Sequence, residues 1–387
     1  MTGGQKLNIK SLLLGSAAAL VAVSGARAAD AIMAPEPEPV EYVRVCDAYG
    51  AGFFYIPGTE TCLSISGYVF YQIGTSTYDL GDTPAYFYGG GLGGADATDD
   101  SWVKTVRARV NFDARSETEW GTLRSYIRMQ ASWGGGAALF GDGPVAVDQA
   151  YIQLGGFTMG YTDTFWVTTP GGGVTSSLSH SWTGLYGNGG QQRALIGYSF
   201  NSNGFHGALA LEDDGQQGDE YMPDVVGKVA YTGGWGAVWL TAAYDEDRGQ
   251  AGLTVNDDSF HVQGGLHLNV PNMPGSSFRL IGVYNSADSP VYGGNSAFGV
   301  DAEWNIMASY NHAFSSTLSA SLGVQYFHDL YAGLSSDVSS GVDAWAGELS
   351  LVWLPVTNFE VRSELHYDKA ENVDGTFSGY LRFTRYF

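Results

Sequence analysis

Residues 102–133 read WVKTVRARVNFDARSETEWGTLRSYIRMQASW, and apolar and polar side chains alternate along most of this stretch. In its first half the apolar positions are Trp102, Val106, Ala108, Val110, Phe112 and Ala114, and the polar positions are Arg107, Arg109, Asn111, Asp113 and Arg115. In its second half Leu123, Ile127, Met129 and Ala131 alternate with Arg124, Tyr126, Arg128 and Gln130. A period of two predicts two β-strands, each with one apolar face and one arginine-rich face.

The same alternation predicts sixteen strands in all. Besides the two in 102–133, they are 63–73, 145–154, 156–161, 191–200, 204–212, 224–233, 235–246, 259–270, 276–287, 302–313, 316–328, 342–354, 358–369 and 376–387. Short connections such as 154–156 and 200–204 alternate with long ones such as 74–101 and 162–190. This rhythm indicates an up-and-down antiparallel membrane barrel with two unlike ends, because a Greek-key sandwich would not produce it.

The strand predicted at 358–369 shows where the polar faces point. Its polar positions are Glu360, Arg362, Glu364, His366 and Asp368. Five ionisable side chains in a dry core would be costly, so this face must meet water. If lipid covers the apolar face, the polar face lines a wet lumen, and closure of the sheet removes the edges that lipid cannot hydrate. About sixteen strands leave an aqueous channel rather than a filled core.

Composition and charge exclude one large class of function. The chain has 387 residues with 55 glycines, 24 tyrosines, 19 phenylalanines and 10 tryptophans, which suits turns and membrane-interface aromatics. Its formal net charge is −22, and no run of lysine and arginine is present. A nucleic-acid partner is not expected, because a phosphate backbone requires basic patches.

The beginning of the chain predicts export. Residues 1–28 have the basic, apolar and A-x-A parts of a cleaved signal peptide. Residues 29–62 are then expected to form an extended segment and a loop closed by a disulfide between Cys46 and Cys62, the only cysteines. No CxxC motif is present, so we interpret this disulfide as structural. The barrel itself is predicted to occupy residues 63–387.

Three stretches carry a resemblance to a known family. They are KLNIKSLLLGSAAALVAVSGARAADAI (6–32), VEYVRVCDAYGAGFFYIPGTETCLSISGYV (40–69) and the C-terminal GYLRFTRYF (379–387). The chain resembles the general porins of alphaproteobacteria, of the kind found in Brucella and rhizobial relatives. The resemblance covers most of the chain and implies a sixteen-stranded, trimeric diffusion channel of the bacterial outer membrane. Its expected partners are small hydrophilic solutes, ions, outer-membrane lipid and two further copies of the chain.

The candidate site is a pore constriction. In porins of this kind the third long loop folds into the barrel, and here that loop is 162–190. Opposite it we expect pore-lining arginines on one face of two adjacent strands, together with one further arginine and the only acid of the loop. These residues are Arg107, Arg109, Arg124, Arg128, Arg193 and Asp163. Charged rings in a narrow channel bias which ions enter, and we expect weak selectivity because acidic outer loops oppose the arginines.

Other classes of function have weaker support. A substrate-specific channel, for sugars as an example, remains an alternative, and a secreted soluble β-sandwich adhesin or lectin is a more distant one. Ser179, His180 and Ser181, with His261 and His267, are candidates for hydrolysis by residue type only, and no G-x-S-x-G, P-loop or HExxH motif is present. We therefore expect no enzyme, no cofactor and no metal site. The acidic run DATDD (96–100) lacks EF-hand spacing, and we interpret it as solvated loop charge.

Overall fold

The structure is a computed structural model that describes residues 44–76, 102–135, 145–168, 179–182, 192–213, 222–247, 257–289, 291–293 and 298–387. Residues 45–387 form one compact unit. The predicted signal peptide and the segment 29–43 lie outside the described residues. Within the described residues, no helix has the length and hydropathy needed to span a lipid bilayer.

Seventeen strands and one short helix make up the described fold. In chain order they are η1 (Asp47–Tyr49), β1 (Phe53–Tyr55), β2 (Cys62–Ser76), β3 (Trp102–Thr118), β4 (Gly121–Gly135), β5 (Ala146–Leu154), β6 (Phe157–Asp163), β7 (Gln192–Ser202), β8 (Phe205–Asp213), β9 (Asp224–Gly233), β10 (Gly236–Asp245), β11 (Ser259–Asn269), β12 (Ser277–Asn285), β13 (Ala302–Ala313), β14 (Leu318–Leu330), β15 (Ala344–Val356), β16 (Phe359–Ala370) and β17 (Thr376–Tyr386).

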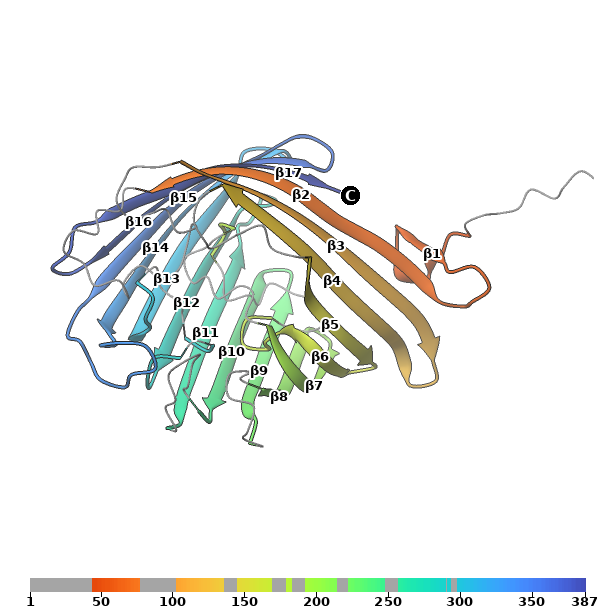
Figure 1. Ribbon diagram of the computed structural model, residues 1–387, viewed down its shortest axis with the longest axis horizontal. Coiled ribbons are helices and arrows are strands. Elements are labelled where there is room, and N and C mark those ends of the chain that lie inside the picture. Colours follow the sequence, from red (N-terminus) through yellow and green to blue (C-terminus); the bar gives the residue numbers. More distant parts are fainter. Residues whose placement is uncertain are drawn as a thin grey trace, which may run out of the picture. The chain divides into compact units, whose positions relative to one another are not determined.

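The strands from β2 to β17 close into a barrel. Each pairs antiparallel with the next in the chain, and β17 pairs back onto β2, with Arg382 opposite Gln72 (Figure 1). The predicted sixteen-stranded antiparallel barrel is confirmed, including the two shortest predictions, which became β6 and β8. The three-residue β1 was not predicted, and it pairs only with β2, outside the closed ring.

The outer face of the barrel is apolar. On β10 Leu240 is 51% exposed, whereas its neighbour Trp239, on the inner face, is 2% exposed. The same alternation continues along β9, where Val229 is exposed and Lys228 is buried. Aliphatic side chains turned outward over many adjacent strands need lipid rather than water around them. This arrangement rules out the soluble β-sandwich.

Exposed aromatic side chains form two rows, one near each end of the strands. Near the short turns they are Phe157, Tyr198, Phe200, Phe205, Trp235, Phe314 and Trp353, and near the long connections they are Tyr244, Phe260, Tyr284, Trp304, Trp345 and Phe377. Amphipathic rings at both ends of an apolar band are typical of the two interfaces of a membrane. The two rows therefore mark the part of the barrel that lipid surrounds.

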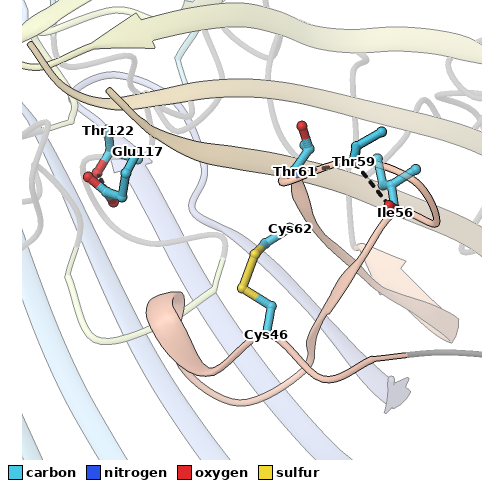
Figure 2. Close-up of a disulfide and its surroundings, with 7 residues drawn as sticks. All are labelled: Cys46, Ile56, Thr59, Thr61, Cys62, Glu117 and Thr122. Carbon is cyan, nitrogen blue, oxygen red and sulfur yellow. Dashed lines mark hydrogen bonds between the residues drawn. A yellow bond between two sulfur atoms is a disulfide. The ribbon is translucent and has the colours of Figure 1, made fainter. Parts of the chain in front are cut away.

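A disulfide closes the segment that precedes β2. Cys46 and Cys62 are bonded, as predicted, and Figure 2 shows the bond joining the start of this segment to the first residue of β2. The backbone N–H of Cys46 donates to the carbonyl of Phe53 at 3.0 Å. The guanidinium of Arg115, on β3, lies 5.1 Å from the ring centroid of Phe53. The closed loop thus packs against the barrel wall near the turn between β3 and β4.

Candidate pore constriction

Four of the predicted arginines share the lumen face of β3 and β4. Arg107 donates to Ser132 at 2.9 Å, and Arg109 donates to Gln130 at 2.6 Å from Nη2. Since these partners are directly opposite in the β3–β4 register, the hydrogen bonds hold the guanidiniums along the strand. The side chains of Arg109, Arg124 and Arg128 keep 20%, 21% and 13% exposure, so they face the open part of the lumen.

Aspartates pair with these arginines across the wall. Asp113 accepts from Arg115 at 2.7 Å and from Arg124 at 2.8 Å. Asp163, the acid predicted for the loop, lies at the end of β6 and is 3.5 Å from Arg128. Each guanidinium–carboxylate pair has little net charge, so the wall is less positive than its arginine content suggests.

A third acid, Asp148, was missed by the sequence analysis. It accepts from Nε of Arg128, and it lies 3.6 Å from Arg109. Strict alternation in β5 would place Asp148 on the lipid face with Ala150. The β4–β5 register shifts between Arg128 and Met129, however, and this bulge turns Asp148 inward beside Gln149. Nothing in the sequence alternation signals the bulge.

Arg193, the further predicted arginine, lies on another strand and has different neighbours. It lies on β7 opposite Thr162, is 7% exposed, and donates from Nη1 to the carbonyl of Gln192 at 3.5 Å. The side chain of Gln192 donates to Asp163 at 2.8 Å. The structure therefore brings Asp163 to the arginine wall and leaves Arg193 on a buried part of the lumen face.

The predicted loop 162–190 contacts the lumen face in both of its described pieces. Its first described piece, 164–168, follows β6 directly, and the N–H of Phe165 donates to Glu212 on β8 at 2.8 Å. Lys228 on β9 donates to the carbonyl of Thr168 at 2.8 Å. A side chain at Gly197 would clash with the ring of Phe165, 2.7 Å from an ideal Cβ, so this close packing requires glycine on β7. The piece therefore packs against the lumen face of β7, β8 and β9.

The second described piece, 179–182, lies against a different group of strands, β12, β13, β15 and β16. His180 is hydrogen-bonded to Ser277 on β12 and to Ser309 on β13, both at 2.8 Å. Ser181 donates to Glu348 on β15, and the N–H of Trp182 donates to Glu364 on β16 at 2.7 Å. Burial and the charge of Arg279 lower the pKa of His180 to about 3, so the imidazole is neutral here.

Two further arginines approach the loop, and neither was in the predicted site. The guanidinium of Arg382 on β17 lies 4.8 Å from the ring centroid of Trp182, and that of Arg362 on β16 lies 5.8 Å from it. Arg382 also donates to Gln72 at 2.8 Å. The alternation of the last strand could have identified Arg382, because it has the opposite parity to Leu381 and Phe383.

The connection between β12 and β13 also folds inward, which the sequence did not predict. The hydroxyl of Tyr292 donates to Asp224 at 2.8 Å, and its ring meets Trp166 of the loop edge-on at 6.2 Å. At the base of this connection, Asp288 accepts from the N–H of Asp301 at 2.7 Å. Burial and the nearby charge of Asp288 raise the pKa of Asp301 well above its usual range.

The hydrolytic candidates take part in buried hydrogen-bond networks. Ser259 is 2.8 Å from Nε2 of His261, and Nδ1 of His261 is 2.9 Å from the side-chain oxygen of Asn285. This is the order of nucleophile, base and orienting group, but His261 is 0% and Ser259 3% exposed. Around His180, both ring nitrogens contact serine hydroxyls, and no carboxylate orients the ring.

The described residues contain no group of three or more His, Cys, Asp or Glu side chains arranged to hold a metal ion. The acidic run 96–100 lies outside them. The lumen of the described barrel is lined by charged and hydroxyl side chains. Described pieces of loop 162–190 and of the β12–β13 connection pack against this lining. A closed barrel with a lipid-facing outside and such a lumen defines a channel of the outer membrane.

Comparison with known proteins narrows the class to a family. The family model described as "Porin subfamily" matches residues 30–381. Porin Omp2b of Brucella neotomae is 36% identical over 419 residues, covering 98% of this chain and 100% of that protein. The chain belongs to the porin subfamily and is a general outer-membrane porin.

Solved structures agree at the level of the fold. The outer-membrane channel DcaP of Acinetobacter baumannii has a TM-score of 0.61 at 12% identity, covering 86% of this chain and 99% of that one. The trimer form of OmpT of Vibrio cholerae has a TM-score of 0.56 at 11% identity, covering 85% of this chain and 100% of that one.

Proposed function

We propose that the barrel is a passive channel for small hydrophilic solutes and ions, narrowed by the loop 162–190. The observation that carries this proposal is that both described pieces of the loop contact the lumen face, through Phe165 on one side and Trp182 on the other. Long loops that return into a barrel commonly have a functional role. The open path is then bordered by the arginine wall of β3 and β4.

We further propose weak ion selectivity. Five arginines on this wall, Arg107, Arg109, Arg115, Arg124 and Arg128, share it with three aspartates, Asp113, Asp148 and Asp163. The small positive excess favours anions at the narrow point. Acids of the predicted outer loops, such as Asp96, Asp99 and Asp100, favour cations at the mouth, so the two influences oppose each other.

A substrate-specific sugar channel is the second candidate. The rings of Tyr126 and Tyr151 stack at 5.1 Å on the lumen face, and such a platform could bind a sugar ring. The guanidinium of Arg124 lies 4.9 Å and 5.4 Å from these two rings, however, and occupies part of the platform. This arrangement favours the general channel.

We infer that the channel carries out no reaction and uses no cofactor. The one serine–histidine–asparagine arrangement in the described barrel, Ser259, His261 and Asn285, is sealed by Trp166 and Tyr292. A hydrolase needs its nucleophile to reach the substrate. The hydroxyl of Ser259 has no such access, and its contacts serve to satisfy buried polar groups.

The export signal and the oligomeric state are also proposals. A cleaved signal at 1–28 accounts for delivery to the outer membrane, and 29–62 would then precede the barrel of 63–387. A homotrimer is supported by family membership and by the trimer form of OmpT, which shares the fold. Three parallel barrels are the assembly we expect.

Liposome swelling tests the proposed function. Vesicles containing the purified protein should swell at rates that fall smoothly as the neutral sugar outside becomes larger. A size-graded series without preference supports a general channel, because exclusion by pore width depends on size alone. One sugar that enters far faster than smaller ones would support the substrate-specific channel instead. Absence of swelling with folded protein would contradict both.

A further inference from the structure

Trp182, in the predicted constriction loop, lies beside the seam of the barrel, which is the pairing of β17 with β2. Its indole lies beside two guanidiniums that are neighbours in the β16–β17 register, Arg382 at 4.8 Å and Arg362 at 5.8 Å from the ring centroid. The ring of Tyr68, on β2, meets it edge-on at 6.2 Å between centroids. A single loop side chain thus touches β16, β17 and β2.

The side chains around Trp182 are themselves held in place. Arg362 donates to Glu360 at 2.9 Å and to Glu364 at 3.2 Å. Arg382 donates to Gln72 at 2.8 Å, and its guanidinium lies 4.5 Å from the ring centroid of Phe70. Because the side chains of Arg362 and Arg382 are already held by these contacts, they lose little conformational entropy when the indole packs against them.

The residues before Trp182 extend the same attachment. Arg279 on β12 donates to the carbonyl of Ser179 at 2.8 Å, His180 contacts Ser277 and Ser309, and Ser181 contacts Glu348. Four consecutive loop residues therefore contact β12, β13, β15, β16, β17 and β2. These hydrogen bonds align the segment, but only Trp182 reaches across the seam between β17 and β2.

We propose that Trp182 is the positioning residue of the pore constriction, and that its contact with Arg362 and Arg382 holds residues 179–182 against the wall. This inference rests on the proposed role of loop 162–190 as the constriction. When the indole is in place, the width of the open path is fixed. When the indole leaves, residues 179–182 move away from the wall and the channel current fluctuates.

Single-channel recording in planar bilayers tests this role of Trp182. Trp182→Ala removes both cation–π contacts, so the fraction of time in altered conductance levels should rise roughly 5- to 30-fold. Trp182→Phe keeps a smaller aromatic face and should restore much of the steady current. Trp120→Ala is the matched control, because Trp120 is an exposed tryptophan at the turn between β3 and β4, away from the loop.

A second variant guards against a folding defect. Arg382→Lys keeps the charge but loses the planar guanidinium, and it should raise the fluctuations in the same direction as Trp182→Ala. Each variant is first checked for folded barrel by its migration on unheated gels. Steady wild-type-like current from both Trp182→Ala and Arg382→Lys would overturn this role of Trp182 while leaving the porin function intact. Absence of current from the wild-type protein would instead contradict the proposed function.

Discussion

Arg128 on β4 donates from Nε to Asp148 on β5, and this pairing exists because the two strands change register at that point. Arg128 also lies 3.5 Å from Asp163 at the end of β6. One guanidinium thus links three strands of the lumen wall. We propose that the arginine–aspartate pairs of this wall, rather than its arginines alone, determine the ion selectivity of the channel.

Neutralising Asp148 should make the channel more selective for anions. Asp148→Asn keeps the shape and removes one negative charge from beside Arg109 and Arg128, so the anion-to-cation permeability ratio should rise roughly twofold. The reversal potential under a salt gradient measures this ratio. Glu119→Gln, at an exposed turn, is the control and should change little. An unchanged ratio in Asp148→Asn would show that the bulge lies away from the ion path.

Removal of two wall arginines should act in the opposite direction. Arg124→Ala with Arg128→Ala leaves Asp113 and Asp148 without these partners, so the reversal potential should shift toward cations by a roughly twofold or larger permeability change. Arg385→Ala, an exposed arginine at the end of β17, serves as the control for lost charge. A reversal potential equal to that of the wild-type protein would contradict a role for these arginines at the narrow point.

Docking of the β12–β13 connection should depend on pH through Asp301. Its pKa is raised in the folded protein, whereas a free aspartate ionises near pH 4. The docked loop is therefore most stable below about pH 4 and loses stability as the pH rises toward the folded pKa of Asp301. The facing titratable groups are Asp288 and Tyr331, and neither supplies a positive charge.

Hydrogen exchange measures this dependence. After correction for intrinsic rates, amides of 286–289 should exchange faster near pH 8 than near pH 5. Asp301→Asn cannot ionise, so its protection should be nearly independent of pH. Equal pH dependence in the variant and the wild-type protein would assign the effect to other groups.

The Cys46–Cys62 disulfide should stabilise the segment before β2 without affecting conduction. Its closed loop spans a sequence separation of 16 residues, for which chain entropy predicts about 3 kcal/mol. Replacement of both cysteines by serine should make residues 46–62 sensitive to protease while the single-channel conductance stays unchanged. Alkylation of both thiols in denatured, non-reduced wild-type protein would show that the disulfide does not form.

The fold was predictable because each strand carries its own period-two signal. In β16 the alternation of Glu360, Arg362 and Glu364 with Val361 and Leu365 identified both the strand and its wet face. The closure of the sheet followed from the need to pair every backbone group in lipid. The same alternation predicted that Arg107 and Arg109 on β3 and Arg124 and Arg128 on β4 share one face, and the β3–β4 register agrees.

The site was less predictable, because it depends on departures from that period and on long-range contacts. The bulge that turns Asp148 inward is invisible in alternation. Arg193 has the correct parity, but its burial depends on long-range packing that alternation does not encode. The contact between Trp182 and Arg382 joins residues far apart in the chain, and no local pattern specifies it.

Single-channel conductance of the purified wild-type protein in a planar bilayer tests the central claim most directly. A water-filled, loop-narrowed porin should open in discrete steps, in threes for a trimer, with a current proportional to voltage and a small reversal potential under a salt gradient. Folded protein that inserts but conducts no current would contradict an open channel.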